Sequence, residues 1–229
     1  MNRAINEFVA MADVRDMYMA HTMLRREFRL LTQAVRNVAP GNIKQASVVG
    51  AHIHLVCGIL HLHHEGEDLV LWPLLLERGG QETAAIVPTM EEQHLVIHRA
   101  YDEVTGLLPG WRATGRGGEK LTGALERLLT GLVKHLALEE KEILPLAEKY
   151  VTAAEWNQLA EHGFAKSAKS TLPLTFGMAM YEADSELIKD LLAQAPPPAR
   201  VIMLLLGPRL YAARAKRVYG TPTPPRIGA

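Results

Sequence analysis

The feature that most constrains the fold of this chain is a pattern of metal-binding residue types that occurs twice, 72 residues apart. In each copy a histidine is followed four residues later by a glutamate, the next residue is also acidic, and a proline stands ten residues after the histidine. The two copies are His63, Glu67, Asp68 and Pro73, and His135, Glu139, Glu140 and Pro145. Residues four apart lie on one face of an α-helix, and the surrounding leucines indicate that this face is buried. Because buried imidazoles and carboxylates are costly unless they are paired or bind a metal, the repeat predicts that two halves of the chain contribute to one metal site.

The composition indicates a globular chain without a strong charge bias. The 229 residues are enough for one sizeable domain with an appendage. The formal net charge is zero, so no overall field favours nucleic acid or an acidic substrate. The single cysteine, Cys57, excludes an internal disulfide framework, and residues 1–15 lack the apolar core of a signal peptide. No run approaches the ~18 apolar residues that span a bilayer, so we expect a cytoplasmic protein.

Apolar residues at spacings of three and four predict four long helices, which cover about residues 9–38, 45–77, 87–108 and 119–150. Glycine and proline separate the helices, and the longest loop is expected at residues 109–118. The pattern predicts an all-α protein, with an up-down-up-down four-helix bundle over residues 1–150. The first and second pairs of helices resemble two copies of one hairpin.

Residues 151–229 are predicted to form a C-terminal helical extension. Residues 152–155 resemble a capping box that opens a short helix, and further helices are expected over residues 178–195 and about 199–219, the last interrupted at residues 207–208. The proline-rich tail from Thr221 is expected to be flexible and unpacked. The last helix is basic and could bind a membrane surface or a partner. We instead expect it to cover one side of the bundle and to show its charges to water.

The candidate metal ligands are the histidines and glutamates on the inward faces of the four helices. They are His21, His63, Glu67, His94, His98, His135 and Glu139. Nitrogen and carboxylate donors suit iron, manganese or zinc, and two bridging carboxylates could hold two metal ions ~3.5–4 Å apart. The first half of the chain offers two histidines and the second half three, because Arg25 occupies the position that matches His98. With two six-coordinate ions and a shared oxo or hydroxo group, one position stays open on the ion served by two histidines.

These seven residues make the chain similar to hemerythrin-like proteins, the HHE cation-binding family, over about residues 10–150. The resemblance implies a four-helix bundle with two non-haem iron ions. It implies that His94, His98 and His135 hold one iron, that His21 and His63 hold the other, and that Glu67 and Glu139 bridge. In the oxygen-carrying members a histidine is followed five residues later by an aspartate, whereas here His135 is followed four residues later by Glu139, as in bacterial and sensor-type members. The resemblance therefore supports the metal site more than simple O2 storage. The C-terminal segment resembles the extensions of actinobacterial members.

Several polar residues near this set have two open interpretations. His61 and His64 lie off the face of His63 and are expected at the surface or behind a ligand, although His64 with Asp68 would take over if the bundle were rotated. Glu91 could orient His94 or be a solvated acid. Arg25 and Tyr101 could border the open position or pack at the rim.

The leading functional hypothesis is binding and redox handling of O2 or a related small oxidant, such as peroxide or NO, at the open iron position. A possible peroxide- or NO-directed enzymatic activity stays open. The alternative is an iron- or oxygen-responsive regulatory module that acts on a partner through residues 151–229. A ferritin-like oxidase is disfavoured because that class uses four carboxylates and two Glu-x-x-His motifs, and only residues 91–94 fit. No nucleic-acid or membrane partner is expected, and the sequence does not indicate the oligomeric state.

Overall fold

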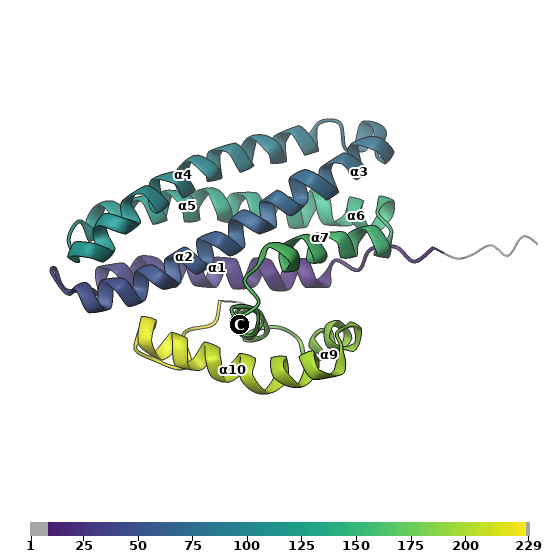
Figure 1. Ribbon diagram of the computed structural model, residues 1–229. Coiled ribbons are helices and arrows are strands. Elements are labelled where there is room, and N and C mark those ends of the chain that lie inside the picture. The colour runs from purple at the N-terminus through teal and green to yellow at the C-terminus, as the bar shows by residue number, and fades with distance from the viewer. Residues whose placement is uncertain (1–8, 228–229) are drawn as a thin grey trace, which may run out of the picture.

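The computed structural model describes residues 9–227, and four long helices dominate it. Their bounds are α1 Arg15–Arg36, α2 Ile43–Gly66, α4 Ile86–Thr114 and α5 Gly118–Leu138. Each long helix runs antiparallel to the one before it along the chain (Figure 1). Two short helices, α3 Trp72–Arg78 and α6 Leu144–Tyr150, continue α2 and α5, and a 3-10 turn at Gly80–Glu82 leads into α4. The predicted all-α bundle is confirmed.

The apolar spacing within each helix determines which face is buried. In α1, Leu24, Phe28 and Leu31 follow one another at spacings of four and three, and all are fully buried. Local signals fix the helix ends. The Asn42 side chain accepts a hydrogen bond from the Gln45 N–H and caps α2.

The loop expected at residues 109–118 is wrong. α4 continues through Pro109 to Thr114, and only residues 115–117 connect it to α5. Trp111 is buried in the core, and the Arg112 side chain lies so close to Gly50 of α2 that a Cβ there would come within 2.4 Å of it. These contacts between helices outweigh the local preference of proline and glycine for a loop.

The core is divided into two apolar clusters along the bundle. One cluster contains Leu24, Leu60 and Leu132, and the other contains Met17, Leu71 and Ile143. On each of α1, α2 and α5, the polar residues of the repeat lie in sequence between members of the two clusters. The candidate metal site is therefore enclosed at both ends by apolar side chains, which limits the access of water.

One segment of the chain, Ile43–Arg78, is long and apolar enough by length and composition to cross a membrane. It consists of α2, the turn that follows it and α3, and 44% of its most apolar window is buried inside the structure. It also carries three residues of the candidate site, so it behaves as a core helix of the bundle.

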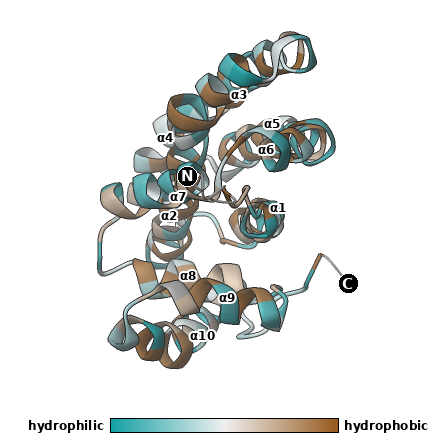
Figure 2. Ribbon diagram, turned by 90° about the vertical axis from the view of Figure 1, so that its right-hand side faces the viewer, coloured by the Kyte–Doolittle hydropathy of each residue, from teal (hydrophilic) through white to brown (hydrophobic). Residues whose placement is uncertain are grey.

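Four helices follow the bundle, and their bounds are α7 Ala153–Lys166, α8 Leu172–Met180, α9 Ser185–Gln194 and α10 Pro197–Tyr219. The predicted capping box is confirmed, since the Thr152 hydroxyl accepts from the Glu155 N–H and the Glu155 carboxylate accepts from the Thr152 N–H. α7 packs on α2, whereas α8 and α10 lie together across α1 and α2, as Figures 1 and 2 show.

Three expectations for the extension are corrected. A single helix over residues 178–195 is wrong, because the chain turns after α8 and Asp184 caps α9. The break at residues 207–208 is wrong, because α10 is continuous and Gly207 packs directly on Gly177 of α8. The tail is not wholly unpacked, since the Tyr181 hydroxyl donates to the Pro224 carbonyl and the Ile227 N–H donates to the Glu182 carboxylate.

Candidate metal centre

Two π-helical turns position the central carboxylates. The turns span Glu67–Leu71 and Glu139–Ile143, so each begins at the glutamate of the repeat. The Trp72 N–H donates to the Glu67 carbonyl and the Leu144 N–H to the Glu139 carbonyl, five residues back in each case. The proline that follows each donor has no N–H, so the α-helical ladder is interrupted at that point. The wider turn therefore explains why a proline stands ten residues after each histidine.

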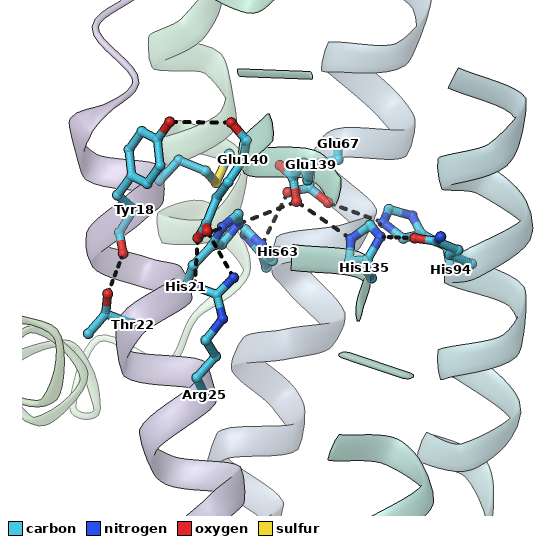
Figure 3. A network of polar contacts seen from close by, with 12 residues as sticks. Tyr18, His21, Thr22, Arg25, His63, Glu67, His94, His135, Glu139 and Glu140 are labelled. Atoms are coloured by element: carbon cyan, nitrogen blue, oxygen red, sulfur yellow. Dashed lines mark hydrogen bonds and ion pairs between the residues drawn. The ribbon is translucent and has the colours of Figure 1, made fainter. Parts of the chain in front are cut away.

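The side chains of the repeat converge between the helices (Figure 3). Oε1 of Glu67 lies 3.1 Å from Nε2 of His63, and Oε2 lies 3.3 Å from Nε2 of His94. The Glu67 carboxylate therefore lies between one imidazole from α2 and one from α4.

The second carboxylate repeats this arrangement. Oε2 of Glu139 lies 3.4 Å from Nε2 of His21 and 3.5 Å from Nε2 of His135. These histidines come from α1 and α5. Two buried carboxylates thus face four imidazoles, one from each long helix of the bundle.

The ligand atoms form two groups that share one residue. One group is His64, Glu67, His94 and His135, the other is His21, His63, Glu67 and Glu139, and the ligand atoms within each group lie within 4.8 Å of one another. Glu67 belongs to both groups. The groups are unequal, with three histidines in one and two in the other.

Several buried atoms of the two groups lack a hydrogen-bond partner among the described residues. They are Nε2 of His21, His63 and His64 and both carboxylate oxygens of Glu67 and Glu139. Leaving such atoms unpaired costs about 1–3 kcal/mol each, and more for charged groups. A cation between them satisfies all of these atoms together, so the donor set fits metal ions.

The pKa shifts of His63, His135 and Glu139 agree with a site for metal ions. Burial lowers the pKa of His63 to about 4 and that of His135 to about 3, so both imidazoles are neutral, the form that binds metals. Burial and the neighbouring Glu67 carboxylate raise the pKa of Glu139 well above its usual value. A cation removes this repulsion between the two carboxylates and allows both to be ionised.

The acidic residue that follows each central glutamate contacts the outer nitrogen of a histidine on another helix. Oε1 of Glu140 lies 2.9 Å from Nδ1 of His21. Arg25 binds both oxygens of Glu140, at 2.6 and 2.9 Å, and so fixes the carboxylate. Figure 3 shows this chain of contacts at one side of the centre. Holding Nδ1 of a ligand histidine leaves Nε2 to point at the metal.

The first copy of the repeat has the same arrangement. Oδ1 of Asp68 lies 2.7 Å from Nδ1 of His94 and also accepts from the Trp72 indole N–H at 2.9 Å. Burial lowers the pKa of His94, but the nearby carboxylates of Asp68 and Glu67 favour the protonated imidazole, outweigh burial and raise that pKa to about 9. The acid after each glutamate therefore belongs to the site, a role that the repeat pattern itself could have indicated.

Six of the seven predicted ligands are brought together, and His98 is not. The His98 side chain is 55% exposed and lies 3.2 Å from Asp102 on the outer face of α4. His64 lies in the cluster instead. It is buried, and its ring stacks on that of His94 with centroids 4.0 Å apart.

The other residues with open interpretations divide between the centre and the surface. Arg25 lies beside the centre through Glu140. His61 stacks on Tyr101, with ring centroids 5.7 Å apart, outside the two ligand groups. Both line an open groove of about 470 Å³ between α2 and α4, together with Glu91. His64 and His94 also line this groove, so it joins the surface to the group with three histidines.

The fold and the donor set define a helical-bundle protein with a buried centre for metal ions. The family model of the Hemerythrin HHE cation binding domain matches residues 12–147, and the chain belongs to this family. No curated protein and no solved structure matches the chain. The match ends within α6, so it covers the bundle and not α7 to α10.

Proposed function

We propose that this chain holds two non-haem iron ions and handles O2 or a related small oxidant there. The observation that carries the proposal is the pair of buried ligand groups joined by Glu67 and supplied unequally with histidine. Iron would supply the redox chemistry, as cofactors do in general. The protein residues supply imidazole and carboxylate donors, hold their orientation and exclude bulk water. The ligands in this proposal are His21, His63, His64, Glu67, His94, His135 and Glu139.

The groove between α2 and α4 is the entry path in this proposal, and it reaches the group with three histidines, not the two-histidine group on which the sequence placed the open position. It is lined by Leu60, Leu95 and Ile97 beside the imidazoles, and so combines apolar walls with polar atoms at its base. Diatomic molecules and peroxide are small enough for a groove of about 470 Å³ and need no dedicated recognition of a large substrate. We propose that the protein acts in the cytoplasm, where its one buried cysteine stays reduced.

The test is anaerobic loading with ferrous iron, followed by exposure to O2, peroxide or NO in separate samples. We expect about two iron ions per chain and a ligand-dependent charge-transfer band in the visible spectrum. Glu67→Ala should abolish loading, whereas Glu77→Ala, an exposed glutamate at the end of the same segment, should not. Iron uptake without any spectral response would contradict the proposed reaction with oxidants. No iron uptake at all would contradict the proposed metal centre as well.

A second function is favoured by one contact between the extension and the bundle. Glu27 of α1, six residues after His21, accepts hydrogen bonds from Tyr211 and Tyr219 of α10 at 2.6 Å each. Loading that shifts α1 would therefore reach the extension, as a regulatory module requires. Hydrogen exchange of the iron-free and iron-loaded forms tests this. Slower exchange in α8 and α10 on loading is expected, and identical exchange there would exclude the regulatory function.

A further inference from the structure

The outer helix α10 leaves an unusual amount of aliphatic surface uncovered. Its buried side is a single stripe of Gly207, Tyr211, Ala215 and Val218, spaced by three and four residues. The exposed aliphatic residues are Val201, Ile202, Leu204, Leu205, Leu206 and Leu210, each between 42% and 56% exposed. α10 forms the lower edge of the molecule, away from the metal centre (Figures 1 and 2).

The backbone contact with α8 fixes which side of α10 faces outward. A Cβ at Gly177 would come within 2.1 Å of the Gly207 carbonyl oxygen, so the two helices touch backbone to backbone. Gly207 lies in the middle of the aliphatic run. Holding this glycine inward turns Leu205 and Leu206 outward, whereas Leu204 lies on the side of the buried stripe and is exposed because that stripe begins only at Gly207.

Cationic residues share the exposed side with the aliphatic ones. Residues 195–229 contain six cationic side chains and no acidic one, although the whole chain has zero formal charge. Arg209, Lys216 and Arg217 are exposed, and neither Lys216 nor Arg217 forms a side-chain ion pair in the part of the chain that the structure describes. The outward face of α10 is thus aliphatic in its first half and cationic in its second.

We propose that this face of α10 docks on an anionic lipid surface, lying parallel to it. Lysine and arginine near such a surface each contribute about 1 kcal/mol, and aliphatic side chains beside them enter the boundary between headgroups and acyl chains. The helix has 23 residues, so at ~1.5 Å per residue it presents a face roughly 34 Å long.

Charge and shape favour an anionic lipid surface over the two other candidates for this face, a second copy of the chain and a groove on another protein. A second copy of the chain would bring the same cations towards each other, because the face carries no acidic residue to pair with them. A protein groove would meet a convex face whose exposed apolar residues are all aliphatic, without the Trp and Tyr side chains that are enriched at the energetic centres of protein interfaces. The sequence favoured a helix that covers the bundle and shows its charges to water over one that binds a membrane surface or a partner. The structure adds that Val201, Leu205 and other aliphatic residues of this helix are exposed as well.

The test is co-sedimentation of the full iron-loaded chain with vesicles of phosphatidylcholine alone or of phosphatidylcholine mixed equally with phosphatidylglycerol. We expect binding to the anionic vesicles only, weakened by salt. Leu205→Ser and the pair Lys216→Gln and Arg217→Gln should each weaken binding about tenfold or more. Phe164→Ser, which removes a 55% exposed apolar residue on α7, should bind as the wild type does.

Circular dichroism and iron content check that each variant is folded. Equal binding to both kinds of vesicle, or binding unchanged by the α10 substitutions, would overturn the proposal. So would a lack of vesicle binding by folded protein. A dimer that Leu205→Ser dissociates, seen by sedimentation without vesicle binding, would assign the face to a second copy instead.

Discussion

At the scale of single residues, the most informative pair is His64 and His98. Both are histidines within reach of the groove between α2 and α4, but only His64 is buried against the other ligands. We expect His64→Ala to lower the iron content by about one ion per chain, because it removes a donor from one group only. His98→Ala is the matched control and should load fully. Elemental analysis after anaerobic loading measures the iron content of both variants. A loss of iron in His98→Ala alone would show that His98, as expected from sequence, is the ligand and His64 is not.

The carboxylate behind His21 offers a second prediction. Glu140→Gln keeps the size of the side chain but weakens its contact with His21 and Arg25. Losing such an orienting partner typically lowers metal affinity ~10–100-fold, and we expect that range here. Glu142→Gln is the control, because this partly exposed residue on the same turn pairs with Lys141 and with none of the candidate ligands in the described part of the chain. Competition with an iron chelator measures the affinity. Equal affinities in the two variants would show that Glu140 does not orient the site.

At the scale of helices, the packing of α8 on α10 depends on Gly177. A methyl group there meets backbone atoms of Gly207, which cannot rotate away as a side chain could. Gly177→Ala should therefore force the helices apart and lower the free energy of unfolding by roughly 1–3 kcal/mol. Gly163→Ala on α7 has open space around it and should be neutral or stabilising, since alanine favours helix. Chemical denaturation of both variants gives the comparison, and equal stability would contradict the close contact.

The helices also show how far the sequence could predict the site. The repeat predicted four of the converging residues, and the apolar faces of the other two helices predicted His21 and His94, because each helix face is set by spacing alone. His64 was missed because a helix projection places it off the face of His63, whereas the centre is wide enough to use both directions: His63 contacts His21 of α1, and His64 stacks on His94 of α4. The π-helical turns that begin at the glutamate of each copy of the repeat were also not expected. The spacing of apolar residues indicates neither the type of a helical turn nor a bend in the helix. The prolines at 73 and 145 were the local signal for these turns.

The helix after Pro109 and the break at Asp184 illustrate a different limit. Proline and glycine near residue 109 favour a loop by local preference, yet Trp111 is buried and holds the helix in place. Conversely, the apolar residues of α8 and α9 look continuous until Asp184 caps the second helix. Tertiary contacts decide the first case, and a single sequence does not contain them, whereas the Asp184 cap is a local signal that the sequence does contain.

At the scale of the whole molecule, the bundle and the extension are joined by a buried charged cluster around Glu27. Its carboxylate lies near Arg26 of α1, 2.9 Å from His52 of α2, and accepts from Tyr211 and Tyr219 of α10. Burial raises the pKa of Glu27, but these partners outweigh burial and lower that pKa to about 2. The ionised carboxylate is thus a structural link between the two parts.

This link predicts an acid-dependent loss of stability. A carboxyl whose pKa is lower in the folded state stabilises the fold above its unfolded value of ~4.3, and the contribution is lost as the pH falls towards 2. Its size is on the order of 3 kcal/mol. Glu27→Gln should remove this dependence, so the difference in unfolding free energy between wild type and variant should shrink between about pH 5 and pH 2. A difference that is constant over this range would contradict the assignment.

The sharing of Glu67 between two ligand groups affects how the centre fills. Once the first ion fixes this carboxylate, the second ion meets a donor that is already oriented. When iron is scarce, molecules would then be found empty or doubly occupied, and singly occupied ones would be rare. Such all-or-none occupancy would keep a lone redox-active ion from lingering in a half-assembled cage.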